Sequence, residues 1–92
     1  MKYLVFMRLM EPYVENGKRM IQIEKKRTEK HENWGKEAIF PIHTIATNGK
    51  SFMVIETDDP MKLAKYRHDY GGVLEVEIHQ IHEWSKVREL FT

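Results

Sequence analysis

The sequence contains no cysteine, which excludes disulfides, thiolate zinc sites, iron–sulfur clusters and cysteine nucleophiles. This absence is compatible with a reducing compartment, and we expect a cytoplasmic protein. An excess of charge of one sign is also lacking, because 15 Lys and Arg stand against 14 Asp and Glu, for a net charge of +1. There is no global field to attract nucleic acid or an acidic membrane, so binding has to depend on local features.

Long hydrophobic runs are equally scarce, and the nearest candidate is the opening stretch "MKYLVFMRLM". Arg8 interrupts it, Glu11 and Pro12 follow, and no small-residue cleavage pattern is present. The run is too short for a membrane span and unlike a signal peptide. We therefore interpret it as a buried strand at the native start of the chain, and we expect no membrane partner.

A chain of 92 residues with 41% hydrophobic content predicts one domain, residues 1–92, because shorter chains have little interior to divide. A chain of this size buries only about 60–65% of its unfolded surface. With no disulfide available, oligomerisation is a natural way for it to gain stability.

The first half of the chain predicts a strand and then a helix. Residues 2–10 are apolar at both parities, which is typical of a central strand covered on both faces. Pro12 suits a first helical turn, and the following residues predict a helix that ends near His31. Trp34-Gly35 is the expected exit turn. Residues at helical spacing along one side are Tyr13, Gly17, Met20 or Ile21, Glu24 and Thr28.

The stretch "AIFPIHTIATNGKSFMVIET" predicts an antiparallel hairpin, because two apolar runs flank Asn48-Gly49, the strongest signal for a two-residue turn. Pro41 cannot donate to a ladder, so the first of these strands should lie at a sheet edge or carry a bulge.

A second helix should begin after Asp59, which can cap free amides, with Pro60 in its first turn and Gly71-Gly72 at its end. In "VLEVEIHQIHEW" apolar and polar residues then alternate as in a half-buried strand. "SKVRELF" predicts a short terminal helix with Ser85 as its cap.

The resulting order, β-α-β-β-α-β, predicts an α+β ferredoxin-like fold, in which a four-stranded antiparallel sheet carries two helices on one face. The strands expected at its centre are apolar on both sides, with Phe52 and Val54 opposite Met53 and Ile55. An open face this apolar needs a cover, so we expect a homodimer.

The stretches "MKYLVFMRL", "FMVIETDDP" and "VLEVEIHQI" give the whole chain a resemblance to a family of short uncharacterised proteins in the dimeric α/β-barrel superfamily. The resemblance implies two facing sheets that enclose a pocket, often with the final strand reaching the partner. Members include cofactor-free monooxygenases, muconolactone isomerase-like enzymes and binding proteins with no known reaction. No catalytic motif of the monooxygenases aligns with this sequence, so the resemblance implies a pocket and not a chemistry.

Strand parity selects the candidate site. If the odd residues of the first strand face the helices, its even residues face the open side, and Arg8 is the polar member. Few polar groups in an apolar enclosure are typical of a ligand site. The candidate residues are Arg8, His43, Glu56, Glu77 and His79, among Leu4, Phe6, Phe52 and Val54, with Pro41 leaving the parity of His43 open.

Two interpretations of these side chains remain open. In one, Arg8 binds a carboxylate or enolate, His79 or His43 moves protons, and Glu56 orients one of them. In the other, Arg8 and Glu56 form an ion pair for its own sake, and the charges of the last strand lie at a wet rim.

A metal site is the next alternative. A regular strand sends His79 and His82 to opposite faces, although a bulge at Ile81 would bring both to one side. Without cysteine or a helical HExxH motif we expect no metal and no cofactor.

A nucleic-acid interface is disfavoured. In "EKKRTEK" and its surroundings Glu24, Glu29 and Glu32 interleave the basic residues, which is typical of a solvated helix face. The topology matches the RNA-recognition motif, but "KSFMVIET" supplies only Phe52 for stacking, and Glu56 repels phosphate.

The sequence thus predicts a protein that binds an unidentified small molecule in a homodimer pocket, with no nucleic-acid partner. The alternative is a cofactor-free monooxygenase- or isomerase-like enzyme, and whether any reaction is catalysed stays open at this point.

Overall fold

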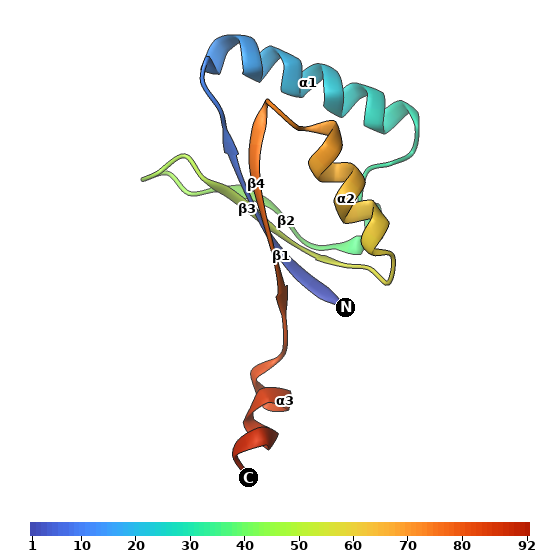
Figure 1. The fold of residues 1–92 in the computed structure, drawn as a ribbon, viewed down its shortest axis with the longest axis vertical. Coiled ribbons are helices and arrows are strands. Elements are labelled where there is room, and N and C mark those ends of the chain that lie inside the picture. The colour runs from blue at the N-terminus through green and yellow to red at the C-terminus, as the bar shows by residue number, and fades with distance from the viewer.

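The computed structural model describes residues 1–92, which form one four-stranded sheet with two long helices and a short terminal one (Figure 1). The sheet order is β2-β3-β1-β4, every neighbouring pair is antiparallel, and the α+β ferredoxin-like fold is confirmed. The elements are β1 (Lys2–Leu9), α1 (Tyr13–Glu29), β2 (Ala38–Thr44), β3 (Ser51–Glu56), α2 (Pro60–Asp69), β4 (Leu74–Ile81) and α3 (Trp84–Arg88), with 3-10 turns at Gly35–Glu37 and Glu89–Phe91.

The core lies between the sheet and the helices α1 and α2. Val5 and Ile55 are fully buried, and Met53 and Met7 are 1% and 4% exposed. Tyr66 of α2 and Tyr70, the residue directly after α2, join this cluster, and alternate residues of β4 pack against it. The odd residues of β1 therefore face the helices, which is the condition on which the candidate site depends, and its even residues face the other side because side chains in a strand alternate.

Pro41 lies in an edge strand and also at a bulge, so both predicted accommodations of the proline occur. Phe40 pairs with Val54 and His43 with Phe52, which leaves one extra residue on β2 between these two pairs. The bulge brings Phe40 and His43 to the same face of the sheet, where their rings stack with centroids 4.8 Å apart.

The β2–β3 hairpin is present, but its predicted two-residue turn is wrong. The backbone amide of Ile45 donates to the carbonyl of Lys50 at 2.8 Å, so the closed loop is the longer segment 46–49. Gly49 has φ of 68°, the left-handed conformation that glycine adopts without strain, and the Asn48 side chain accepts from the Lys50 amide. The Asn-Gly signal located the turn and not its length.

Two predicted helix caps have different outcomes. The Asp59 carboxylate accepts from the Met61 amide at 3.0 Å, and Pro60 occupies the first turn of α2, as expected. The Ser85 cap is wrong, because α3 begins one residue earlier, at Trp84, with Glu83 in the cap position.

The basic stretch of α1 is not wholly solvated, which corrects the expectation for "EKKRTEK". Arg27 is only 5% exposed and donates to Asp69 of α2 at 2.6 Å and to the Glu32 carbonyl at 2.7 Å. Its guanidinium also lies 5.2 Å from the Tyr66 ring centroid. The buried side of α1 thus includes Asn16 and Arg27, whereas Tyr13 is 58% exposed.

The C-terminal segment 82–92, which we call the arm, extends away from the sheet at the end opposite α1 (Figure 1). Its large apolar side chains Trp84, Leu90 and Phe91 are 66%, 82% and 78% exposed. None of the helices combines the length and apolar character that crossing a bilayer requires.

Candidate functional site

The face of the sheet opposite α1 and α2, called the open face here, carries the residues selected by parity in two cross-strand rows. The strand register defines both rows, because paired residues lie side by side on the same face. One row is Phe40, Val54, Leu4 and His79, and the other is His43, Phe52, Phe6 and Glu77, in each case across β2, β3, β1 and β4.

Aromatic rings from both of these rows contact one another across all four strands of the open face. We call this set, which consists of His43, Phe40, Phe52, Phe6 and His79, the aromatic row. The Phe40 ring stacks on Phe52 at 5.7 Å between centroids, with 10° between the ring planes. Phe6 lies 6.5 Å from Phe52 and 6.2 Å from the His79 ring. His43 continues the row beside Phe40, and its Nδ1 lies 2.8 Å from the Pro41 carbonyl oxygen. The other ring nitrogen of His43, Nε2, makes no hydrogen bond within the chain.

Charged groups surround Phe6. The Lys50 ammonium lies 4.8 Å from the Phe6 ring centroid and 3.6 Å from the Glu77 carboxylate. His79 Nε2 lies 3.5 Å from the same carboxylate. The hydrogen bond with His79, followed by the Lys50 charge, holds the pKa of the Glu77 carboxyl below its ordinary value. Glu77 is therefore an anion at neutral pH, placed between an imidazole and an ammonium group.

Arg8 and Glu56 do not form the ion pair that the structural interpretation predicted. Glu56 is the cross-strand partner of Lys2, and Arg8 is the partner of Glu75. Lys2 and Arg8 are six positions apart in β1, which corresponds to about 20 Å along a strand. Arg8 makes no ion pair and is exposed, as is Glu75, and both line one small hollow with Phe6 and Lys50.

Glu56 also cannot orient the imidazole of His79, since the carboxylate beside that ring belongs to Glu77. Of the predicted site residues, the structure brings together Phe6, Phe52, His43, Glu77 and His79, places Arg8 in the next row and leaves Glu56 at the far end.

The predicted alternative of a bulge at Ile81 is wrong. The register of β4 with β1 runs without a shift from Leu74 to Ile81, and His82 lies beyond the strand. His79 and His82 are therefore not brought to one side, and no three His, Asp or Glu side chains converge in a metal-binding arrangement.

The sequence-based site lacked Lys50, Phe40 and Glu75, although Glu75 has the same parity as the candidate Glu77. Lys50 lies between the Asn48-Gly49 turn and β3, and extending the parity of Phe52 and Val54 back by two residues would have found it. Phe40 lies before the bulge, so its side depends on a feature that parity does not contain.

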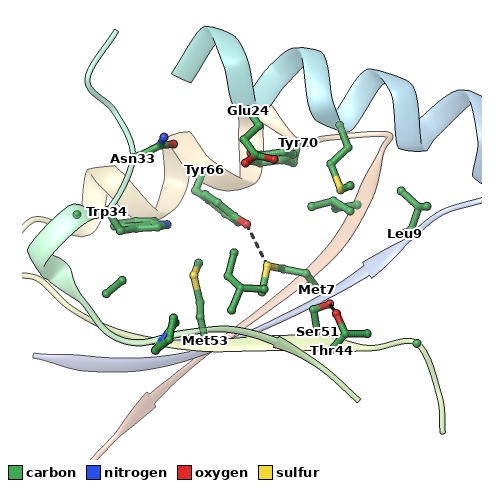
Figure 2. A pocket seen from close by; sticks show the side chains of 17 residues that line it. Met7, Leu9, Glu24, Asn33, Trp34, Thr44, Ser51, Met53, Tyr66 and Tyr70 are labelled. Atoms are coloured by element: carbon green, nitrogen blue, oxygen red, sulfur yellow. Dashed lines mark hydrogen bonds between the residues drawn. The ribbon is translucent and has the colours of Figure 1, made fainter. Parts of the chain in front are cut away.

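A second concave feature lies on the other side of the sheet, between β1–β3 and the helices (Figure 2). This helix-side cleft has a volume of about 550 Å³. No residue proposed from the sequence as a ligand contact lines it. Its lining includes Met7, Met20, Glu24, Trp34, Pro41, Ile42, Thr44, Ser51, Met53, Tyr66 and Tyr70.

The polar groups of the cleft are few. The Tyr66 hydroxyl donates to the Met7 sulfur at 3.0 Å, and the hydroxyls of Thr44 and Ser51 bond to each other at 2.9 Å. The Trp34 indole nitrogen is shielded from solvent and has no hydrogen-bond partner. Burial raises the pKa of both Tyr66 and Tyr70, so their hydroxyls stay protonated.

The comparisons agree with the predicted resemblance at the level of an uncharacterised family. No curated protein matches the chain significantly. The family described as "Domain of unknown function (DUF3303)" matches residues 1–92, which is the full length of this sequence. The chain therefore belongs to the DUF3303 family.

Proposed function

We propose that this protein is a homodimer that binds a small molecule between the open faces of its two sheets, as in the dimeric α/β barrels. The single observation that carries the proposal is the uncovered aromatic row from His43 to His79 across all four strands. A contiguous apolar patch of this kind is typical of an interaction site. A second copy of the chain supplies a cover of matching shape and chemistry.

The arm supports a second copy as the cover. The radius of gyration is 14.8 Å, whereas a compact chain of this length has about 12 Å. The arm contributes to this excess, because it extends from the body and exposes Trp84, Leu90 and Phe91 (Figure 1). In the dimer these side chains pack on the partner, which removes their apolar surface from water.

The charges of the open face suit a pairing with itself. Lys2, Arg8 and Lys50 balance Glu56, Glu75 and Glu77, so two copies meet without net repulsion. Arg8, Lys50 and Glu75 lie beside one another on this face, where each can pair with an opposite charge of the second copy.

The enclosed space offers a defined chemistry to a ligand. Arg8 is free to bind a carboxylate, the phenylalanine rings can pack on an aromatic ring, and the histidine rings can donate or accept hydrogen bonds. An aromatic carboxylate fits this set.

Catalysis is the alternative in the same pocket. The pairing of His79 with Glu77 supplies a candidate proton acceptor of the kind that a monooxygenase- or isomerase-like reaction requires. Turnover of a bound molecule would favour the enzyme, and stabilisation without turnover would favour the binding protein.

A single-stranded nucleic acid is the second alternative cover, because bases stack on aromatic rows of this kind. The three acidic side chains of the open face oppose it, since such interfaces require a positive groove along the phosphates.

Light scattering tests the dimer. We expect the wild-type chain to be dimeric at micromolar concentration and Phe40→Glu to be monomeric, since Phe40 is 41% exposed on an edge strand and the folded chain tolerates the change. Ile21→Glu, on α1 and 57% exposed, is the matched control and should remain dimeric. A wild-type monomer would remove the enclosed pocket.

Thermal unfolding with benzoate tests the ligand chemistry. Benzoate should raise the midpoint of the wild-type dimer, Arg8→Met should abolish that shift while remaining folded, and Glu56→Gln should preserve it, because Glu56 lies far from Arg8. If benzoate raises the unfolding midpoint of Arg8→Met as much as that of the wild type, Arg8 does not bind the ligand.

A further inference from the structure

The helix-side cleft has the size and the lining of a second ligand site, independent of the open face. Its volume of about 550 Å³ lies within the range of small-molecule pockets. Three methionines, Met7, Met20 and Met53, line it together with Trp34, Tyr66 and Tyr70. Flexible thioether side chains adapt to the outline of an apolar ligand, and the aromatic rings give it flat surfaces.

The aromatic rings form a wall and not a cage. The Trp34 and Tyr66 centroids are 5.6 Å apart, and those of Tyr66 and Tyr70 are 4.8 Å apart, so these rings pack on one another. A cage for a cation instead surrounds an open space with several ring faces. A wall of contiguous rings suits a flat aromatic molecule that lies along it.

The charge of the lining excludes an anion. Glu24 is the only charged side chain that lines the cleft, and no basic one is present. Arg27 lies near the Tyr66 ring but does not line the cleft, and it donates to Asp69 and the Glu32 carbonyl. A bound carboxylate or phosphate would have no counter-charge, so the ligand is not an anion.

The hydrogen-bonding groups of the cleft lack an acceptor. In Figure 2 the Trp34 indole nitrogen points toward the space beside Tyr66, and this shielded atom has no partner. The nearby Tyr66 hydroxyl donates only to a thioether sulfur, which is a weak acceptor. Buried donors nearly always have a partner, so an orphaned indole N–H beside a cleft marks a place for a group that accepts from it.

We propose that the helix-side cleft binds a neutral, planar aromatic molecule with a carbonyl acceptor, which lies against Tyr66 and accepts a hydrogen bond from the Trp34 indole. The site does not rest on the dimer. Met7 and Met53 face the cleft, whereas their neighbours Phe6 and Phe52 face the open side. A ligand in the cleft therefore leaves the aromatic row untouched.

Nitrogen-15 NMR of the Trp84→Phe variant tests the proposal, because the chain has two tryptophans and this change leaves Trp34 as the only indole. The probe is 1-acetonaphthone, and its control is 1-ethylnaphthalene, which has the same outline without an acceptor. We expect 1-acetonaphthone to move the Trp34 indole N–H signal saturably and downfield. It should bind about fivefold more tightly than 1-ethylnaphthalene, which is the contribution of one net hydrogen bond.

Two variants locate the contact. Trp34→Phe lacks the reporting indole, so its affinities are measured by calorimetry. It should retain 1-ethylnaphthalene and reduce the affinity ratio of the two probes to about one, because one hydrogen bond accounts for the difference. Met20→Trp fills the cleft and should abolish binding of both, whereas Ile21→Trp, at the adjacent and 57% exposed position, should not. Each variant adds one indole signal, and the Trp34 signal is identified by comparison with the spectrum of the Trp84→Phe variant. If Trp34→Phe fails to fold, the two probes on the Trp84→Phe variant still decide.

Three results would contradict the proposed site or its indole contact. An indole signal that does not move up to the solubility of 1-acetonaphthone would refute the site. Equal affinities of the two probes in the Trp84→Phe variant would refute the indole contact. If 1-acetonaphthone still binds to Met20→Trp but no longer binds to Phe40→Glu, its site is the open face and not the cleft. The Phe40→Glu monomer should itself bind 1-acetonaphthone normally, which separates failure of this site from failure of the dimer.

Discussion

Arg27→Met removes the guanidinium that joins the end of α1 to α2. Arg27 is 5% exposed and donates to Asp69 at 2.6 Å and to the Glu32 carbonyl at 2.7 Å, and it lies over the rings of Tyr66 and Tyr70. Methionine retains most of the apolar stem. The substitution therefore isolates the charge and its hydrogen bonds from the packing of the side chain.

The expected loss is about 3 kcal/mol of unfolding free energy. Removing one partner of a buried ion pair costs about 3–5 kcal/mol, because the other partner is left as an uncompensated charge. The Asp69 side chain is 17% exposed and keeps a contact with Lys65 at 3.3 Å, so part of this cost is relieved and the lower end applies. Burial alone would raise the pKa of Asp69, but hydrogen bonds from Arg27 and Lys65 outweigh it and hold that pKa below its ordinary value.

Urea unfolding at a fixed protein concentration measures the change, and Lys65→Met is the matched control. The Lys65 side chain is 48% exposed, so its pairs with Glu32 and Asp69 contribute about 0–1 kcal/mol. For a domain of this size, the loss of about 3 kcal/mol expected for Arg27→Met corresponds to a decrease of about 12–24 °C in the melting temperature.

Arg27→Met with Asp69→Asn should cost clearly less than the sum of the two single changes, because the two groups share one interaction. A loss in Arg27→Met no larger than that in Lys65→Met would refute the structural role of the pair.

Three further outcomes are expected. Burial raises the pKa of Tyr66, so the unfolded chain loses the hydroxyl proton near pH 10 while the folded chain keeps it. The free energy of unfolding should therefore fall above pH 10 by about 1.4 kcal/mol per pH unit, and less steeply in Tyr66→Phe. Asp59→Ala should cost about 1 kcal/mol in thermal unfolding, since it removes the cap of α2. Trp84→Ala should weaken the dimer in sedimentation more than Trp34→Ala, because Trp84 lies on the exposed arm.

The sheet and its two faces were predictable because they follow from a period of two residues. Once Val5 and Met7 are assigned to the core, every even residue of β1 is fixed on the open face, and the register carries this choice to β3 and β4. The cap of α2 was predictable because its donor and acceptor lie two residues apart.

Contacts between distant segments were not predictable in this way. Arg27 lies in a stretch of alternating charge that is typical of a solvated face, yet its partner Asp69 is 42 residues further along the chain. The same limit applies to the helix-side cleft, whose walls Met20, Trp34 and Tyr66 come from α1, the segment after it and α2. Spacing along a sequence says which side of one element a residue occupies, but not where two elements leave space between them.

The bulge in β2 shows how one local irregularity sets the chemistry of both faces. In a regular strand that begins with Phe40 on the open side, Ile42 would also face that side and His43 would face the helices. The extra residue reverses this arrangement, so that His43 joins Phe40 and Phe52 in the aromatic row while Pro41 and Ile42 line the cleft. A proline without an amide to donate is tolerated here because β2 is an edge strand. The parity of His43 was therefore undecidable from alternation alone, since it depends on a residue that alternation does not count.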